Sequence, residues 1–455
     1  MTARIRSGQA TRQRAGTKRA LRLILIASVA TLMPLIAAAQ SYETIYSFQG
    51  SPDGADPKGG LVIGANGTLY GTTNAGGTSA FGTVFELTKP TGEPWKETVL
   101  QNFSGSDGQY PQSALVFGST GALYGATAGG QAGPGTIFEL APPAAAGDAW
   151  TETVLYSFGR SRGSQNVLPN GPVLIGPSGT LYTTTHGQPS ATGFILGLVI
   201  ALVPPLAPGG DWTEYELYAF GTPGEDSGLE PLAGVVSVGG SLFGTTFYGG
   251  AGTVYELTPP ATHSGAWTET TIHAFGDTPG DGAYPLAALT VGPGGVLYGT
   301  TSYGGSGMCP YLGGEDGCGT VFTLTPPSSP GGAWTETVIY SFTGSDNGDG
   351  GYPAASVVVG SNGVLYGTTE FGGNATTACP GSFDFIAGCG TVFELTPPSS
   401  KGGAWTEKVL HSFSDADGDG SMPVAGLALS STGVLYGTTS AGGTAGKGTV
   451  FAVAP

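Results

Sequence analysis

The sequence is poor in charged residues. Only 10% of its 455 residues are Asp, Glu, Lys or Arg, against roughly 25% in an ordinary soluble domain. Hydrophobic residues make up 39% and aromatic residues 10%, so the chain is too apolar to be kept unfolded by its own charge. Long apolar runs are also missing after the N-terminal region. The run 194–206 is too short for a membrane helix, which needs about 20 residues.

Other absences narrow the fold class. The chain has 83 Gly and 33 Pro, but Gly does not recur at every third position, which excludes collagen. Gly this frequent disfavours a helical bundle, because each Gly in a helix interior costs up to about 1 kcal/mol. A turn-rich β-protein or a repeat array remains.

The first 40 residues differ from the rest. They hold seven basic residues and no acidic one, followed by an apolar stretch over 23–36 and then Ala37, Ala38 and Ala39. A basic region, an apolar region and an A-x-A site are typical of a secretory signal peptide. An uncleaved anchor is the alternative, which the short apolar stretch and Pro34 disfavour. We therefore expect a signal peptide over 1–39, cleaved near Ala39, and a secreted or periplasmic protein without a transmembrane segment.

Removal of this segment makes the chain more acidic. Residues 1–39 hold seven of the 15 Lys and Arg and none of the 32 Asp and Glu, so the formal charge moves from −17 to −24. A surface of this charge repels nucleic acid and anionic lipid. We expect no nucleic-acid partner.

Internal repetition is the dominant pattern. Leu-Tyr-Gly-Thr-Thr or a near-copy occurs seven times, 54 to 70 residues apart, and its first residues are Leu69, Leu123, Leu181, Leu242, Leu297, Leu365 and Leu435. Each unit contains four strand-like segments. Strand a resembles 61–63 and strand b is the Leu-Tyr string. Strand c resembles Gly-Thr-Val-Phe-Glu-Leu, and strand d resembles Thr-Glu-Thr-Val-Leu-Tyr-Ser-Phe.

The four segments predict strands joined by turns, because they are rich in Val, Ile, Tyr, Phe and Thr and are separated by Gly, Pro, Asn and Asp. Asn66-Gly67 between strands a and b suits a tight hairpin. Seven units of four antiparallel strands predict an all-β fold, a seven-bladed β-propeller over 40–455. A solenoid is disfavoured, because it usually has shorter repeats and needs capping repeats.

The two ends of the chain predict how the ring closes. The mature chain opens with a lone strand d, 43–48, and finishes with strands a, b and c. The N-terminal strand therefore completes the last blade and removes an exposed edge. We predict that 43–48 pairs with 448–453.

These motifs resemble the GloVer tandem-repeat family of exported bacterial proteins. The shared elements are Leu-Tyr-Gly-Thr-Thr, a Gly pair such as Gly76-Gly77, and Gly-Thr-Val-Phe. The third unit departs, with Thr183 in place of Gly. The resemblance implies an exported, propeller-like protein, and no catalytic residue is carried over from it.

All four Cys lie in the long b–c loops of the fifth and sixth units. In an exported protein paired Cys usually form disulfides, and Cys318 and Cys389 occupy the same repeat position. This parallelism favours two local bridges, Cys309–Cys318 and Cys379–Cys389. A zinc site is the alternative, but spacings of nine and ten residues do not suit metal knuckles.

The same two loops are the best binding-site candidate from the sequence. In an antiparallel blade the b–c and d–a loops share one face, and these b–c loops offer aromatic and acidic groups suited to a sugar or a peptide. A loop without any ligand is equally compatible with the sequence. The candidate residues are Tyr303, Tyr311, Glu315, Asp316, Phe371, Phe383 and Asp384.

The d–a loops repeat Asp-Gly-x-x-Pro, as at 53–57 and 281–285. We favour a turn, in which Asp accepts backbone hydrogen bonds and Gly supplies a positive φ, over a ring of carboxylates that binds a cation or sugar. Asp415, Asp417 and Asp419 resemble half of a calcium loop, but an EF-hand needs a Glu at position 12, where Gly426 stands. Calcium remains an open candidate and no other cofactor is expected.

Other residues indicate packing more than chemistry. His273 and His411 replace the Tyr of strand d, so we expect them to pack. The six Trp-x-Glu copies are structural by their repetition, and we expect each Trp to cover the c–d loop of its own blade. No Ser-His-Asp or Cys-His set has catalytic spacing, and no G-x-S-x-G elbow is present. We expect a monomeric, non-enzymatic scaffold that binds an extracytoplasmic glycan, peptide or protein. A carbohydrate-active hydrolase or lyase is the alternative.

Overall fold

The protein is described here by a computed structural model. It describes residues 40–130, 133–145, 147–158, 168–169, 171–186, 189–190, 193–194, 197–207, 209–221, 228–261, 265–276, 278–307, 309, 317–329, 331–344, 348–374, 379, 388–400 and 402–455. The signal-peptide prediction falls on residues 1–39, outside the described residues, and stays a prediction.

The described residues form a seven-bladed β-propeller of four-stranded antiparallel blades, as predicted. The first four blades are β3 (Val62–Ile63), β4 (Leu69–Thr73), β6 (Thr83–Thr88) and β7 (Lys96–Asn102); β8 (Val116–Phe117), β9 (Leu123–Gly130), β10 (Gly133–Ala141) and β11 (Thr151–Ser157); β13 (Leu174–Ile175), β14 (Leu181–His186), β17 (Leu198–Val203) and β18 (Thr213–Ala219); and β19 (Val236–Val238), β20 (Ser241–Thr246), β21 (Thr253–Thr258) and β22 (Thr268–Ala274).

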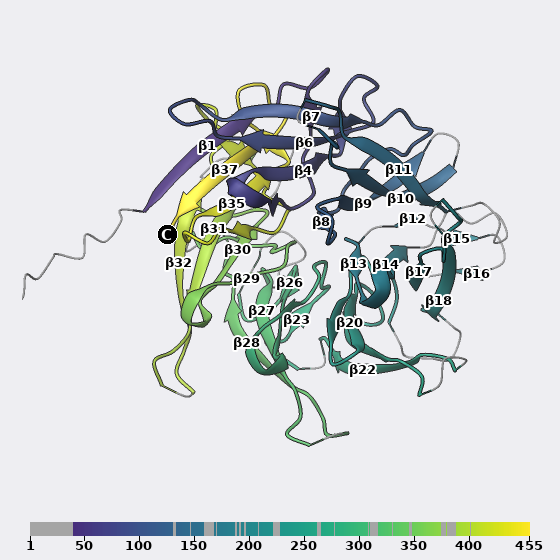
Figure 1. The fold of residues 1–455 in the computed structure, drawn as a ribbon. Coiled ribbons are helices and arrows are strands. Elements are labelled where there is room, and N and C mark those ends of the chain that lie inside the picture. The colour runs from purple at the N-terminus through teal and green to yellow at the C-terminus, as the bar shows by residue number, and fades with distance from the viewer. Residues whose placement is uncertain are drawn as a thin grey trace, which may run out of the picture. The chain divides into compact units, whose positions relative to one another are not determined.

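The last three blades have the same strand order. They are β24 (Thr290–Val291), β25 (Leu297–Thr301), β27 (Thr320–Thr325) and β28 (Thr335–Ser341); β29 (Val358–Val359), β30 (Leu365–Thr369), β31 (Thr391–Thr396) and β32 (Thr406–Ser412); and β34 (Ala428–Leu429), β35 (Leu435–Thr439), β37 (Thr449–Ala454) and β1 (Ser41–Ser47). Figure 1 shows the d strands β7, β11, β18, β22, β28 and β32 on the outside of the ring.

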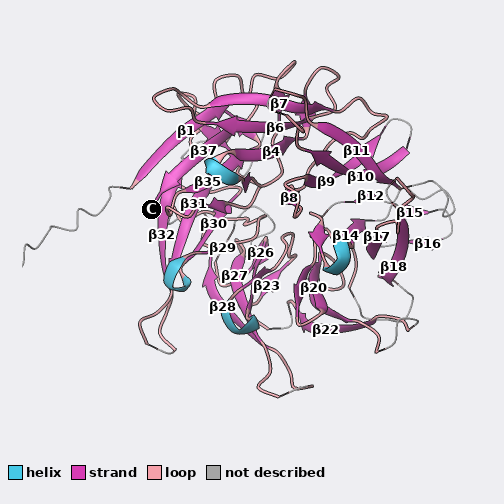
Figure 2. Ribbon diagram, in the orientation of Figure 1, coloured by secondary structure: helices cyan, strands magenta, loops and turns pink. Residues whose placement is uncertain are grey.

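Short elements complete the structure. Further strands pair outside the four-stranded ladders: β12 (Leu168–Pro169) with β14, β2 (Gly54–Ala55) with β5 (Ala75–Gly76), β15 (Pro189–Ser190) with β16 (Gly193–Phe194), β23 (Gly282–Ala283) with β26 (Tyr303–Gly304), and β33 (Gly420–Ser421) with β36 (Ala441–Gly442). The helices of the described residues are single 3₁₀ turns, η1 (Ala65–Gly67), η2 (Pro177–Gly179), η3 (Pro293–Gly295) and η4 (Ser361–Gly363) (Figure 2).

The a–b links are the tight hairpins that the sequence predicts. In η1, Asn66 has φ 62° and Gly67 has φ 78°. Two successive left-handed residues match the right-handed twist of the flanking strands. Asn tolerates this conformation through its short polar side chain, and Gly has no Cβ to obstruct it.

The ring closes as predicted. Strand β1 pairs with β37 in antiparallel register, with Glu43 opposite Ala452 and Ser47 opposite Thr449. The Phe48 N–H donates to the Gly448 carbonyl at 3.0 Å. Closure satisfies the backbone groups that an open edge would expose.

The hydrophobic core lies between the blades. Each of seven buried clusters joins residues of two neighbouring blades. At the closure, Phe48 and Val450 of the last blade pack with Leu69 and Phe85 of the first, and all four are fully buried. Packing therefore runs around the complete ring.

The Trp side chains also contact neighbouring blades. Trp95 of the first blade lies 6.0 Å from Tyr436 of the last, and Trp150 lies 5.8 Å from Tyr70, between ring centroids. We had expected each Trp to cover the c–d loop of its own blade. That expectation was wrong, because the Trp side chains cover strand b of the preceding blade.

Candidate functional site

The b–c and d–a loops lie on one face of the propeller and pair with each other. Three of the two-stranded sheets, β2–β5, β23–β26 and β33–β36, join a d–a loop to the b–c loop of the same blade. Isolated bridges make the same connection elsewhere, for example Gln109 to Gly129 and Gly351 to Phe371. We call this side the loop face.

The Asp of each described d–a motif organises its turn, as predicted. The Asp53 carboxylate accepts the N–H groups of Gln49 at 2.8 Å and Gly54 at 2.6 Å. The Asp281 carboxylate accepts those of Gly276 at 3.1 Å and Gly282 at 2.7 Å. These carboxylates therefore satisfy backbone donors of the loop and hold the turn.

The Gly of the same motif has the expected positive φ in two loops, at Gly108 and Gly350. Gly54 has no positive φ, and a Cβ there would overlap the Thr73 side chain. The Thr73 hydroxyl bonds to the Thr83 hydroxyl at 2.8 Å. The side chain of the second Thr of strand b lies so close to the loop that only Gly fits at this position.

In six of the d–a loops the residue before Pro is also left-handed. We call this the pre-proline position, and its φ lies between 56° and 61° at Asp56, Tyr110, Glu230, Tyr284, Tyr352 and Met422. Non-Gly residues held in this region cost of order 1–3 kcal/mol and cluster at ligand sites.

Backbone hydrogen bonds hold the pre-proline residues in place. The Tyr352 N–H donates to Cys318 of the preceding blade at 2.9 Å, and its carbonyl accepts from the Glu370 N–H at 3.0 Å. Tyr284 is held in the same way by Ala251 and Ser302. A regular backbone thus carries side chains that differ from blade to blade.

Six aromatic rings form a continuous series on the loop face, from the fourth blade to the sixth. Successive ring centroids lie between 4.5 and 5.6 Å apart, with edge-to-face or tilted geometry. Tyr248 is 44% exposed and Phe371 only 5%, and the others are half-buried. We call this series the aromatic arc; it runs through Tyr248, Phe247, Tyr284, Tyr303, Tyr352 and Phe371.

A central channel opens inside the ring of blades. It has a volume of about 270 Å³, and all seven blades contribute lining residues at or before strand a. Most of these residues are Gly, Ala or other apolar residues, and Lys58 and Gln112 add polar groups on one side. The channel is therefore narrow and largely uncharged.

Glu370 is a perturbed acidic group beside the aromatic arc. It directly precedes Phe371, and its N–H is bonded to Tyr352. Burial raises the pKa of Glu370 to about 7, and Lys58 acts in the opposite direction. Lys58 also pairs with Asp56 at 3.3 Å. A carboxyl group that is half protonated near neutral pH can donate or accept a proton.

The disulfides are confirmed. Cys309 is bonded to Cys318, and Cys379 to Cys389. All four are buried. Gly344 contacts the first bridge, where a Cβ would lie 3.2 Å from the Cys318 sulfur. The bridges thus fasten both long b–c loops next to the aromatic arc.

The predicted binding residues divide into two groups. Tyr303 and Phe371 belong to the aromatic arc, where Tyr352 connects them. The remaining candidates lie outside the described residues and stay predictions: Tyr311, Glu315, Asp316, Phe383 and Asp384.

Sequence reasoning missed Tyr284, Tyr352, Phe247, Tyr248 and Glu370. The available signal was variation at a fixed repeat position. Tyr stands before Pro at 110, 284 and 352, where other units carry Asp, Leu, Glu or Met. A residue that is not needed for the repeat itself is a candidate for function.

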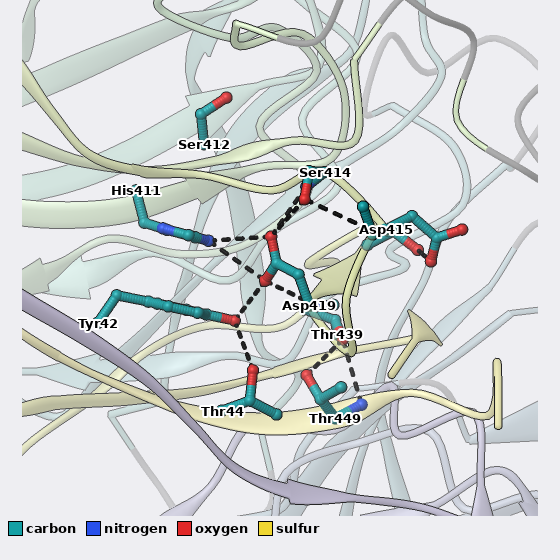
Figure 3. A network of polar contacts seen from close by, with 12 residues as sticks. Tyr42, Thr44, His411, Ser412, Ser414, Asp415, Asp419, Thr439 and Thr449 are labelled. Atoms are coloured by element: carbon teal, nitrogen blue, oxygen red, sulfur yellow. Dashed lines mark hydrogen bonds and ion pairs between the residues drawn. The ribbon is translucent and has the colours of Figure 1, made fainter. Parts of the chain in front are cut away.

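The calcium candidate contains a complete hydrogen-bond network (Figure 3). The Asp419 carboxylate accepts from Tyr42 at 2.6 Å and from the Ser414 N–H at 2.9 Å, and it lies 3.3 Å from His411 Nε2. Asp415 accepts from the Ser421 hydroxyl at 3.0 Å. Asp419 is thus engaged by protein groups, and a calcium site over Asp415, Asp417 and Asp419 stays a prediction.

The seams between blades hold a second set of perturbed acids. At Glu97, Glu336 and Glu407 the seam brings the Glu of Trp-x-Glu close to the loop Asp and to the Tyr or His of the preceding blade. At Glu152 the preceding blade carries Gln101 instead. Burial is the main cause that raises the pKa of Glu97, Glu152 and Glu407 to about 7, and Asp53, Asp107 and Asp349, respectively, add to the effect.

Comparison with known proteins defines the family. The Gloeobacter/Verrucomicrobia repeat matches residues 29–202, 145–376 and 205–451. The chain belongs to this repeat family. The expected resemblance is thereby confirmed over nearly the whole propeller. No curated protein sequence matches the chain significantly.

Some solved structures are similar to this chain, in fold alone. The polysaccharide lyase Uly1 is 12% identical, with a TM-score of 0.48 over 93% of this chain and 94% of that one. The PQQ-bound aldose sugar dehydrogenase of Streptomyces coelicolor is 13% identical, with a TM-score of 0.44 over 92% and 98%. The α-L-arabinanase of Penicillium chrysogenum is 15% identical, with a TM-score of 0.41 over 90% and 97%. Similarity at this level carries no information on activity.

Two further observations bear on location. The two disulfides are consistent with an extracytoplasmic protein, because such bonds persist in oxidising compartments. Within the described residues no helix is long and apolar enough to cross a membrane.

Proposed function

We propose that this repeat protein binds a neutral glycan on its loop face, across the aromatic arc. The observation that carries the proposal is the unbroken series of rings from Tyr248 to Phe371. Ligand sites combine aromatic surface with a few placed polar groups. Sugar rings present flat C–H faces that pack on aromatic rings, and their hydroxyls bond to carboxyl groups such as that of Glu370.

The charge of the chain supports a neutral ligand over an anionic one. The whole sequence has a formal charge of −17, and Glu230 and Glu370 lie in loops of the same face. An acidic polysaccharide would meet a repulsive field on approach. Neutral oligosaccharides are therefore the appropriate first probes.

The test is isothermal titration of neutral oligosaccharides selected on a glycan array. Tyr352→Ala and Tyr284→Ala should each weaken binding about fivefold, because one aromatic contact is worth about 1 kcal/mol beyond its buried area. Tyr110→Ala is the matched control. Tyr110 occupies the same pre-proline position with φ 59°, and its described ring contact is with Phe81, outside the arc.

Equal losses in the Tyr110 and Tyr352 variants would contradict the proposal, because only the shared backbone position would then matter. The absence of any neutral glycan ligand would contradict it as well. Retained binding in Tyr110→Ala, with loss in the two arc variants, would support it.

A carbohydrate-active enzyme is the second candidate, and the pKa of Glu370 near 7 favours it. A general acid must be protonated at the working pH. Product analysis of any bound glycan by mass spectrometry separates the two functions. Turnover that Glu370→Gln lowers at least 100-fold without loss of binding supports catalysis. Unchanged glycan supports a binding protein.

Export would place this protein where extracytoplasmic glycans occur. The basic and apolar segments of residues 1–39 support export, and N-terminal sequencing of the mature protein tests it. A mature chain that begins at Gln40 is the expected result.

A further inference from the structure

One seam of the propeller brings a histidine and two carboxylates together. His273 lies on β22 of the fourth blade, Asp281 in the following d–a loop, and Glu336 on β28 of the fifth blade. One ligand atom from each lies within 4.8 Å of the others. His273 Nε2 and Asp281 Oδ2 are 3.4 Å apart.

Two atoms in this cluster are buried without a hydrogen-bond partner among the described residues. They are His273 Nε2 and Glu336 Oε1. Buried polar atoms are almost always paired in native proteins. Other seams also leave a Glu oxygen without a hydrogen bond, at Glu97, Glu152 and Glu407, but a buried imidazole nitrogen without a hydrogen bond occurs at this seam alone within the described part. Its 3.4 Å contact with Asp281 is an ion pair only when the imidazole is protonated.

The third group is held firmly in place. The Asp281 side chain is only 3% exposed, and its two oxygens accept the N–H groups of Gly276 and Gly282. Such hydrogen bonds orient a carboxylate before a cation binds. Oδ2 faces the imidazole nitrogen.

Equivalent seams lack this combination. In the seam of Figure 3, Tyr42 replaces the Glu and donates to Asp419, and His411 Nε2 lies 3.3 Å from both Asp419 oxygens. In the next seam towards the N-terminus, Tyr340 replaces the His and donates to Asp349 at 2.8 Å. The polar atoms of these His and Tyr therefore have protein partners.

We propose that His273, Asp281 and Glu336 bind a divalent transition-metal ion, with zinc as the best match. One imidazole nitrogen and two carboxylate oxygens are donors that zinc accepts, and three protein ligands leave a fourth position for water. Two ligands of a tetrahedral zinc at 2.0–2.2 Å lie about 3.4 Å apart. The His273–Asp281 distance already has this value.

Glu336 supplies the third ligand. Its side chain is half-buried, and its oxygen lies within 4.8 Å of the other two ligand atoms. The bound ion connects the fourth and fifth blades, since His273 and Glu336 come from different blades. Its ligands are two d-strand residues and the loop residue Asp281, and none of them belongs to the aromatic arc.

The first experiment is isothermal titration of the full mature protein with zinc chloride after removal of metals by a chelator. We expect one ion per chain, and a rise in melting temperature on zinc addition. His273→Tyr introduces the residue that the repeat carries at 46, 156 and 340, so the variant should fold. It should lose at least 100-fold in zinc affinity. Glu336→Gln should lose about tenfold.

The matched control is His411→Tyr, which makes the same exchange at the equivalent position of another blade. It should bind zinc as the wild type does. Cobalt(II) provides a spectroscopic readout, because tetrahedral cobalt absorbs strongly in the visible range. No zinc binding by the wild type, or undiminished binding by His273→Tyr, overturns the proposal. Loss of glycan binding in these variants is not expected.

Discussion

Replacement of three seam glutamates should change how the stability of the propeller depends on pH. The perturbation is the combined variant Glu97→Gln, Glu152→Gln and Glu407→Gln. In each case burial raises the pKa from 4.5 to about 7. The folded chain therefore holds more protons than the unfolded chain between these two pH values. The free energy of unfolding falls as the pH rises from 4.5 to 7, and the loss is complete above pH 7.

The magnitude follows from the shift and the exposure. A shift of about 2.5 pH units corresponds to about 3.4 kcal/mol for a fully buried group. The three side chains are half-exposed, so screening by solvent reduces this to about 1 kcal/mol each and about 3 kcal/mol together. For a unit the size of Ala39–Pro455, the unfolding entropy of roughly 0.9 kcal/mol/K converts this into about 3 °C.

The assay is thermal unfolding of the wild type and the triple variant at pH 4.5 and pH 8. The amide side chains of Gln carry no charge, so burying them does not incur the desolvation cost of a carboxylate. The triple variant should therefore melt about 3 °C higher than the wild type at pH 8. At pH 4.5 the difference should shrink towards zero, because the wild-type carboxyl groups are then largely protonated. An equal difference at both pH values would refute the argument, because the effect would then be one of packing.

Two further predictions concern the loops and the ring. Replacement of Cys309 and Cys318 by Ala should lower the free energy of unfolding by about 3 kcal/mol, since the bridge closes a loop of about ten residues. Calorimetry should show a melting temperature lower by about 3 °C. An unchanged melting temperature would refute this prediction. Phe48→Ala should cost 3–5 kcal/mol in urea unfolding, about as for other buried Phe, because Phe48 is fully buried at the closure. The fully exposed Leu206→Ala is its control, and equal effects of the two would contradict the closure.

The fold could be predicted from the sequence because its determinants are local and repeated. Short β-rich segments recur between Gly and Pro seven times, and the strand pattern at the two ends requires β1 beside β37. Each unit repeats the same information, so the decay of the third copy at Thr183 does not disturb the architecture. The disulfides followed from the same logic, since Cys318 and Cys389 share one repeat position.

The site could be predicted only in part, because it depends on contacts between units. Tyr303 and Phe371 were found in long loops, but Tyr352 lies between them from a different loop of the chain. The partners of His273 are Asp281 in the following loop and Glu336 on β28. The spacing of these residues in the sequence does not indicate that they meet. Replacement of Tyr by His in strand d indicated packing, although the geometry also supplies a ligand set.

The roles of individual residues in the turns were also partly wrong. Gly54 was expected to supply a positive φ, but Thr73 packs against it and the left-handed residue is Asp56. Which residue of the loop adopts the left-handed conformation depends on which side chains of strand b pack against the loop. The sequence does not show these contacts, and the structure does.

The most direct measurement of the central proposal is a crystal structure of the mature protein with a bound neutral oligosaccharide. We predict density for sugar rings across Tyr284, Tyr303 and Tyr352, with hydroxyl groups within hydrogen-bond distance of Glu370. Density on the face of the a–b and c–d loops, or its absence from the aromatic arc while glycan binds in solution, would contradict the account.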